Sequence, residues 1–292
     1  MIAVLITCHN RKDTTLRCLD SLFGQTRLKS VAAQVYLVDD GSTDGTAAEI
    51  AEHFPQVRIL NGDGTLYWNG GMRLAFIEAM KHGYDYYLML NDDTVLFPHA
   101  MAVLLETHSS LEAMGKENAI IVGSTRDPEV GRTTYGGVSR TSRLRRLKFD
   151  LVEPADSMLE CETLNMNCAL IPASVVKRVG NLDPVFTHAM GDYDYGLRAR
   201  QHGCSVWIAP GYLGTCGANP SEGTWRDAAG SLADRIGKVK SAKGLPVKEW
   251  QLFARRHAGP FWIVYWLSPY LKLLVSVLFH RRSDNVDERR RV

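Results

Sequence analysis

Two apolar runs in this sequence end in clustered carboxylates, a pattern that is typical of diphosphate chemistry. Tyr86–Leu90 leads into Asn91–Asp93, and Val35–Val38 leads into Asp39–Ser42. Short apolar runs of this kind indicate buried strands of a parallel sheet. Open α/β sheets bind ligands beyond the carboxyl ends of their strands, where these aspartates would stand. Carboxylates there can hold a divalent cation, which in turn can hold a diphosphate, so the pattern points to nucleotide chemistry.

The elements that must position these carboxylates alternate between strand and helix over residues 1–100. Strands are predicted at Ile2–Ile6, Val35–Val38, Val57–Leu60 and Tyr86–Leu90, with helices between them: one capped by Asp13, the others at Thr46–Phe54 and Gly71–His82. This order implies a parallel sheet with right-handed crossovers. Further along, the sequence predicts strands at Ile120–Val122, Thr134–Val138, Met166–Ile171 and Ser205–Ala209, a solvated loop at Arg140–Lys148, and helices that begin at Pro172 and Gly191.

Size and composition bound the class of protein. A length of 292 residues suits one large α/β domain with an appendage, or two small domains. The net charge of +2 provides no broad basic field, so nucleic acid is not an expected partner, although the segment after His280 is locally basic. The six cysteines show no CxxC pair, which favours reduced cytosolic thiols. Met1–Ile6 reads as the first core strand rather than as a signal peptide.

Phe261–Phe279 is apolar over nearly the length of a bilayer span, but Pro269, Lys272 and serines interrupt it. Its aromatic residues suit a membrane interface, which favours a pair of helices lying in the plane of the membrane. Two alternatives stay open, namely a helix that packs against the main domain and a true span. We expect the protein to be cytoplasmic and peripheral, on the cytosolic face of the inner membrane.

Four stretches together resemble the family 2 glycosyltransferases of the GT-A fold: Thr7–Arg11, Val38–Thr46, Asn91–Asp93 and Gly191–Asp194. The resemblance covers roughly residues 1–217 and implies an α/β domain with a Rossmann-like, mostly parallel central sheet flanked by helices. Residues 1–100 would bind the nucleotide sugar and 101–217 the acceptor, followed by a helical, membrane-associating extension at 218–292. The resemblance also implies an inverting, metal-dependent transferase that uses a nucleotide sugar with Mg²⁺ or Mn²⁺.

In that family the first-strand loop and the Asp-Asp-Gly-Ser turn hold the base and ribose of the donor. The resemblance therefore implies donor contacts for Thr7, Asn10 and Arg11. Asp40 would accept a hydrogen bond from the imide N–H of a pyrimidine, since a wrong base would leave its carboxylate unpaired. Asp39 would serve the ribose or shape the turn. The alternative is that these aspartates bind only backbone N–H groups, which suits Asp44 best.

Asn91–Asp93 stands where the family has its Asp-x-Asp motif, with asparagine in place of the first aspartate. By position, Asp93 is the expected ligand of Mg²⁺ or Mn²⁺, and Asn91 and Asp92 would contact ribose, water or the metal. The cation would offset the charge that builds on the departing diphosphate. A capped strand end with solvated carboxylates is the alternative.

Gly191–Asp194 stands where the family shows Glu-Asp ahead of a Leu-x-Arg helix, and glycine here replaces the glutamate. Asp192 is by position the catalytic base that takes the proton of the acceptor hydroxyl. A free aspartate has a pKa of about 3.9, so this role needs partial desolvation or a late proton transfer. Asp194 is the second candidate, as base or acceptor-binding residue, and Arg198 or Arg200 could pair with these carboxylates. A plain helix-start role is the alternative.

The glycine-rich stretch Asn61–Arg73 would bring backbone N–H groups and a helix N-terminus to a phosphate or sugar. Similar loops in rhamnosyltransferase-like members of the family approach the donor, which implies contacts for Gly64, Asn69 and Arg73; plain loop geometry is the alternative. Many relatives also carry a late histidine at the metal or diphosphate, whereas this chain offers only Cys216 nearby. His188 could bind acceptor or diphosphate, although a lone histidine is more often structural.

The resemblance implies a transferase that moves a sugar, with rhamnose as a candidate, from a UDP- or dTDP-linked donor to a glycan or lipid-linked acceptor of a surface polysaccharide. A sugar-phosphate nucleotidyltransferase is one alternative, but such an enzyme would need glycine in the loop after the first strand, and Thr7–Arg11 contains none. A non-catalytic, membrane-associated glycan-binding relative is another, favoured by the two departures from the family motifs. Self-association into a homo-oligomer stays open. The central expectation is that Asp40, Asp93 and Asp192 converge on one cleft.

Overall fold

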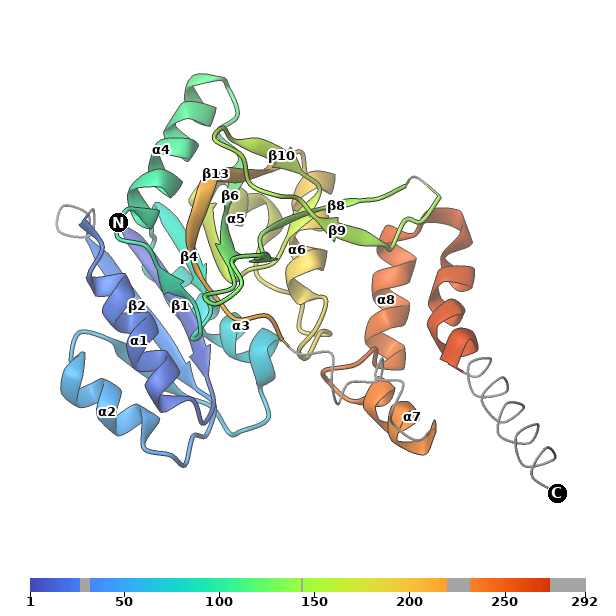
Figure 1. The fold of residues 1–292 in the computed structure, drawn as a ribbon, viewed down its shortest axis with the longest axis horizontal. Helices are drawn as coiled ribbons and strands as arrows, with labels where there is room; N and C mark the ends of the chain where they lie inside the picture. Colours follow the sequence, from blue (N-terminus) through green and yellow to red (C-terminus); the bar gives the residue numbers. More distant parts are fainter. Residues whose placement is uncertain (27–31, 143, 220–231, 274–292) are drawn as a thin grey trace. The chain divides into compact units, whose positions relative to one another are not determined.

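The computed structural model describes residues 1–26, 32–142, 144–219 and 232–273, and the chain divides into two compact units (Figure 1). The first unit comprises Met1–Thr141 and Phe149–Asn219, and the second comprises Ser142–Lys148 and Pro220–Val292. Ser142–Lys148 falls in the stretch that we predicted as a solvated loop of the main domain, and it groups with the second unit instead.

A ten-stranded sheet forms the centre of the first unit, with the order β10-β13-β6-β12-β4-β1-β2-β3 and with β5 and β7 paired to β13 and β6. Its strands are β1 (Ile2–Cys8), β2 (Ala33–Asp39), β3 (Arg58–Asn61), β4 (Tyr86–Leu90), β5 (Val95–Leu96), β6 (Ala119–Arg126), β7 (Thr133–Tyr135), β10 (Leu159–Cys161), β12 (Cys168–Pro172) and β13 (Ser205–Thr215). β1 to β4 run parallel, as do β6 and β13, whereas β12 is antiparallel to both of its neighbours. A second sheet has the order β11-β8-β9, with β8 (Gly137–Arg140), β9 (Phe149–Leu151) and β11 (Thr163–Leu164).

Helices cover both faces of the large sheet because its central strands are apolar on both sides. Ile2, Val4 and Ile6 share a core with α1 (Lys12–Phe23), α2 (Thr46–His53) and α4 (Ala100–Ala113), whereas Ala3 and Leu5 share a second core with α3 (Tyr67–Met80), α5 (Ala173–Val179) and α6 (Gly191–Gln201). Side chains alternate across a strand, so a strand buried on both faces appears in the sequence as a continuous apolar run. The predicted α/β class with a mostly parallel centre is confirmed.

The starts of two helices differ from the prediction. α1 has Arg11 at its N-cap, so Asp13 lies inside the first turn and does not cap the helix. α3 begins at Tyr67 rather than at Gly71, because long-range contacts described below satisfy its first N–H groups. The glycine-rich stretch therefore enters the helix instead of ending at its N-terminus.

The segment between β6 and β12 departs most from the prediction. Thr134–Val138, predicted as one strand, is divided between β7 and β8, which belong to different sheets. Gly136 lies at the break, where a Cβ would stand 2.7 Å from Ser124 Oγ. The Ser124 side chain therefore leaves no room for a side chain at the position where the chain leaves one sheet and enters the other.

The second unit is helical in the part that the structure describes. It contains α7 (Leu232–Lys240), α8 (Val247–His257), the 3-10 turn η2 (Gly259–Phe261) and a helical stretch over residues 262–273. Residues 274–279 of the predicted apolar segment, and the basic tail, lie outside the described residues. Within the described ranges, no helix is both long enough and apolar enough to cross a bilayer.

Candidate active site at the carboxyl ends of the parallel strands

The loop after β1 is hydrogen bonded to the turn after β2, which brings two of the predicted donor motifs together. Cys8 and Asp39 pair in register at the ends of the two strands. The Asn10 N–H donates to Ser42 Oγ at 2.9 Å, and the Thr43 N–H donates to Asn10 Oδ1 at 2.7 Å. The two loops thus form one wall beyond the carboxyl ends of the sheet, where ligands of open α/β folds bind.

Three consecutive residues at the start of α3 each contact a different motif. The Tyr67 N–H donates to Asp40 Oδ2 at 3.0 Å, and the Trp68 indole N–H donates to Asn91 Oδ1 at 2.8 Å. The Asn69 side-chain amide donates to a backbone carbonyl, at 2.6 Å, in the loop that leads to α6. These contacts gather the turn after β2, the end of β4 and the segment ahead of α6 at the first turn of one helix.

Asp40 is buried and caps α3 from a distance in sequence. Its Oδ1 accepts from the Gly64 N–H at 2.8 Å, and its Oδ2 accepts from the Tyr67 N–H. A negative charge beside a helix N-terminus is favourable, so this arrangement stabilises the start of α3. Asp40 therefore accepts hydrogen bonds from backbone N–H groups, which is the alternative role that we weighed for these aspartates. Its contact with a pyrimidine stays a prediction.

The other two aspartates of the string shape backbone turns. Asp39 Oδ1 accepts from the Ser42 N–H at 3.0 Å. Asp44 accepts from the N–H of Thr46 and from that of Lys12, each at 3.1 Å, and so joins the starts of α2 and α1. Asp44 thus binds backbone N–H groups, as the alternative for these aspartates expected, but it also accepts from the Thr46 hydroxyl, and the N-cap of α2 is Gly45.

The N-terminus of α3 is less open to a phosphate than the sequence indicates. The Tyr67 N–H is engaged by Asp40, and the Asn69 N–H donates to the Thr187 carbonyl at 3.2 Å. These two N–H groups already have partners within the protein, and the predicted contact of this stretch with a phosphate or sugar stays a prediction. Arg73 follows in the second turn of α3, where its own carbonyl accepts from the Asn181 amide at 3.1 Å.

Arg11 forms an ion pair with the acidic motif at the end of β4. Its Nη2 lies 2.8 Å from Asp93 Oδ2, and its Nη1 lies 3.2 Å from Asp92 Oδ1. The Cys216 thiol donates to Asp93 Oδ1 at 3.3 Å, which places this cysteine beside the motif where relatives were expected to carry a histidine. Arg11, which we predicted to contact the donor, thus offsets part of the negative charge of Asp92 and Asp93.

The ion pair with Arg11 does not fully compensate the negative charge of Asp92. It is buried, and its Oδ2 has no hydrogen-bond partner among the described residues. Burial raises the pKa of Asp92 to about 7, against the attraction of Arg11 and with the help of Asp93. A second cation would relieve this deficit.

The residues fit a divalent cation at Asp92 and Asp93. No three His, Cys, Asp or Glu side chains gather into a metal-binding group within the described ranges. Mg²⁺ in nucleotide sites nevertheless takes only one or two carboxylates and completes its shell with phosphate oxygens and water. The orphaned Oδ2 of Asp92 is an available ligand atom of that kind.

Asp192, in the first turn of α6, has the desolvation that a catalytic base needs. Burial raises the pKa of its carboxyl to about 6, and hydrogen bonds from the Tyr193 N–H, at 2.8 Å, and from Asn165 oppose the shift. A base with this pKa is ionised at neutral pH and still basic enough to accept a proton.

Asp194 forms an ion pair inside the protein, which favours the helix-start alternative over the acceptor-binding or basic role. Its side chain is fully buried, and its Oδ2 accepts from Arg198 Nε at 2.7 Å. Arg198 also donates to the carbonyls of Val179 and Asn181, so the pair ties α6 to the chain after α5. These contacts give Asp194 a structural role, and its binding of an acceptor stays a prediction.

At Gly191, where the family resemblance leads us to expect a glutamate, Asn69 fills the space that a side chain would take. A Cβ at Gly191 would stand 1.9 Å from Asn69 Oδ1. Asn69 is fully buried, and its amide is held by the carbonyls of Asp183 and Phe186 at 3.0 and 2.6 Å, so it cannot easily move away. The departure from the family motif is therefore a packing adjustment next to Asp192.

Gly191→Ala is accordingly expected to cost about 1–3 kcal/mol of folding free energy, as overpacking does, and to lower transfer by shifting Asp192. Urea unfolding and initial rates measure the two effects. Asn69→Ala in the same chain removes the clashing atom, so the double variant should recover part of both losses. Additive losses in the double variant would contradict the packing explanation.

Strained backbone marks the same region. Asn10, Tyr67 and Met190 are the non-glycine residues with positive φ in the described part of the chain, at 51°, 53° and 70°. Each stands in one of the three segments that meet here. Such conformations cost of order 1–3 kcal/mol and gather at functional sites, where surrounding contacts hold them.

Trp68 and Tyr67 are the site residues that the sequence reasoning did not single out. Both lie in the quoted glycine-rich stretch, but their role depends on the unexpected start of α3. The Tyr67 ring also meets the ring of His188 edge to face, with centroids 6.2 Å apart, so His188 lines the same region. Thr7 contacts α3 as well, because a Cβ on Gly71 would stand 2.0 Å from its Oγ1.

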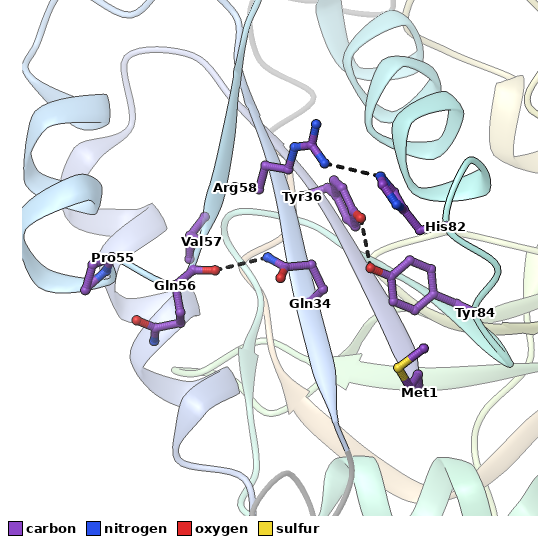
Figure 2. Close-up of a pocket in the computed structure, with 9 residues that line it drawn as sticks. All are labelled: Met1, Gln34, Tyr36, Pro55, Gln56, Val57, Arg58, His82 and Tyr84. Atoms are coloured by element: carbon purple, nitrogen blue, oxygen red, sulfur yellow. Dashed lines mark hydrogen bonds between the residues drawn. The ribbon is translucent and has the colours of Figure 1, made fainter.

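A separate cavity of about 400 Å³ lies at the opposite ends of the strands, beside Met1 and the start of β3 (Figure 2). Its side chains contact one another: the Tyr36 and Tyr84 hydroxyls are 2.8 Å apart, and the Arg58 guanidinium lies 5.6 Å from the Tyr36 ring centroid. Gln34 donates to the Gln56 carbonyl at 3.0 Å. Because these groups satisfy each other, we place the candidate site at the carboxyl ends and not here.

A mostly parallel sheet that is covered by helices on both faces and carries carboxylates at its strand ends is the arrangement that the GT-A fold predicts. The family model described as Glycosyl transferase family 2 matches residues 3–168, which is more than half of the chain, so this chain belongs to glycosyl transferase family 2.

A solved structure supports the fold. The mannosyltransferase PcManGT from Pyrobaculum calidifontis, in complex with GDP-Man and Mn²⁺, is similar with a TM-score of 0.50 and 14% sequence identity, over 82% of this chain and 62% of that one. This chain therefore spans less than two thirds of the length of that neighbour. No curated protein matches this chain.

Proposed function

We propose that this glycosyltransferase inverts the anomeric centre while it moves a sugar, with rhamnose as a candidate, from a UDP- or dTDP-linked donor to a glycan or lipid-linked acceptor of a surface polysaccharide. The observation that carries the proposal is the first turn of α3, which joins the segments of Asp40, Asp93 and Asp192. Inversion needs a base on one side of the sugar and the leaving diphosphate on the other.

Asp192 is the base in this proposal. Its carboxylate accepts the proton of the acceptor hydroxyl as that oxygen attacks the anomeric carbon and the bond to the diphosphate breaks. The pKa of about 6 keeps the carboxylate ionised before the reaction and lets it hold the proton afterwards.

Asp93 and Asp92 would hold a divalent cation, whose chemistry is to offset the charge of the departing diphosphate. The guanidinium of Arg11 must then move from these carboxylates or share them with the cation. On release from Asp93, Arg11 is free to contact a phosphate oxygen, which its forked donors suit. Asp40 would accept from the pyrimidine while it continues to hold the start of α3.

Donor identity is tested by thermal unfolding with Mn²⁺ and a panel of nucleotide sugars. A ligand at a concentration of about 100 times its Kd raises the free energy of unfolding by roughly 2.7 kcal/mol. For a chain of this size, this corresponds to a rise in Tm of roughly 5–10 °C. We expect UDP- or dTDP-sugars to give this shift, and GDP-mannose, the ligand named for the neighbour, to give a smaller one. A larger shift with GDP-mannose would overturn the pyrimidine assignment.

A further inference from the structure

The helical stretch 262–273 is apolar on two opposite sides. One side faces α8 and the segment before it: the Trp250 indole donates to the Trp266 carbonyl at 3.1 Å, and the Tyr270 hydroxyl donates to the Leu245 carbonyl at 2.8 Å. Leu273, on the same side as Trp266 and Tyr270, is buried. This inner side accounts for the packing of the helix within its own unit.

The other side, which we call the outer face, is apolar and exposed. It consists of Phe261, Ile263, Val264, Leu267 and Leu271, whose exposed fractions are 72%, 50%, 65%, 38% and 55%. Single exposed apolar residues are ordinary, but a run at helical spacing forms a continuous patch. Such an exposed patch marks an interaction surface, so we expect something to cover the outer face.

The charge of the second unit indicates what covers it. The whole unit has 18 Lys and Arg against 7 Asp and Glu, while the first unit has 16 against 25. In the described ranges 144–148 and 232–273 the ratio is 11 to 2, and Lys272 is exposed beside Leu271. A net charge near zero therefore conceals a strongly basic unit that carries the apolar face.

We propose that the outer face binds the surface of an anionic phospholipid bilayer, with the helix lying in the interface. An apolar helix face on a basic unit suits the interface of an anionic membrane, because Lys and Arg side chains are attracted to its surface. A second copy of this chain is disfavoured as the partner, because two such basic units repel each other. The inference goes beyond the proposed function and does not depend on it.

Flotation of the full chain with vesicles tests the inference. Vesicles of phosphatidylcholine with phosphatidylglycerol should carry the protein, and pure phosphatidylcholine or high salt should reduce binding at least ten-fold. Val264→Glu with Leu271→Glu should lower binding to the anionic vesicles by roughly 10²-fold, since each removes an apolar side chain from the interface. Val130→Glu is the matched control, because Val130 is 68% exposed but lies in a turn of the first unit.

A second variant guards against misfolding. Arg255→Glu with Lys272→Glu leaves the outer face intact and should abolish the preference for anionic vesicles, whereas Arg132→Glu in the first unit should not. The inference is overturned if the wild-type chain fails to float with anionic vesicles, or if Val130→Glu weakens binding as much as the paired substitution. It is also overturned if light scattering shows that the paired substitution dissociates a dimer.

Discussion

Asp192→Asn is expected to lower the rate of sugar transfer by about 10²–10⁴-fold, the usual contribution of a general base, while donor binding stays nearly unchanged. Asparagine keeps the size of the side chain but cannot accept the proton of the acceptor hydroxyl. The wild-type rate should rise with pH through about 6, as the carboxyl with this raised pKa becomes ionised. Initial rates across pH and donor binding by calorimetry measure these effects.

The same substitution is expected to raise stability at neutral pH. Asp192 has a folded pKa of about 6, above the value of about 3.9 for an unfolded aspartate. Between these values the folded state binds more protons, so the wild-type chain loses stability as pH rises from about 4 to about 6. Asparagine removes this cost, on the order of 1–3 kcal/mol at pH 7, and the Tm should increase.

Asp194→Asn is the matched control for this prediction. This substitution leaves the Arg198 guanidinium without its carboxylate partner and should lower the free energy of unfolding by about 3–5 kcal/mol. Asp192→Asn, by contrast, should raise it. Normal transfer by Asp192→Asn would remove Asp192 from the mechanism. A large fall in its Tm would mean that the carboxylate is needed for folding, and the rate loss would then have another cause.

Asp93→Ala is expected to lower transfer by about 10³-fold and to abolish the rise in Tm that Mn²⁺ gives, because a carboxylate next to the leaving diphosphate is lost. Arg11→Gln shows whether the effect of Asp93→Ala comes from the lost metal ligand or only from the changed charge at the site. Since Arg11 occupies the same carboxylates, its removal should strengthen Mn²⁺ binding in the absence of donor.

Asp20→Ala serves as the control for both variants, because Asp20 is an exposed aspartate of α1. Its rate and its Mn²⁺ response should equal those of the wild type. Unchanged Mn²⁺ stabilisation in Asp93→Ala would place the cation elsewhere, and weaker Mn²⁺ binding in Arg11→Gln would contradict competition between the guanidinium and the metal.

Much of the fold could be predicted from the sequence where local pattern and burial agree. Tyr86–Leu90 is β4 without any change of bounds, and the helix predicted at Thr46–Phe54 is α2, ending one residue earlier. These elements are decided by apolar runs and turn residues that act locally. No prediction was made for α4, although Met101, Leu104 and Leu111 recur at helical spacing and could have revealed it.

The parts that could not be predicted depend on contacts distant in sequence. α3 begins at Tyr67, a residue with positive φ, because Asp40 accepts its N–H from a turn far earlier in the chain. Gly191 is explained only by Asn69, which approaches it from another helix. Single-sequence reasoning proposed the acidic residues of the candidate site, but it did not predict the first turn of α3, which joins their segments.

The most direct measurement is a crystal structure of this chain with UDP and Mn²⁺. We predict the cation on Asp93, the pyrimidine beside Asp40, and the Asp192 carboxylate facing the position of the transferred sugar. A nucleotide bound at the cavity beside Tyr36 and Arg58, or any of the three aspartates turned away from the diphosphate, would contradict a shared cleft.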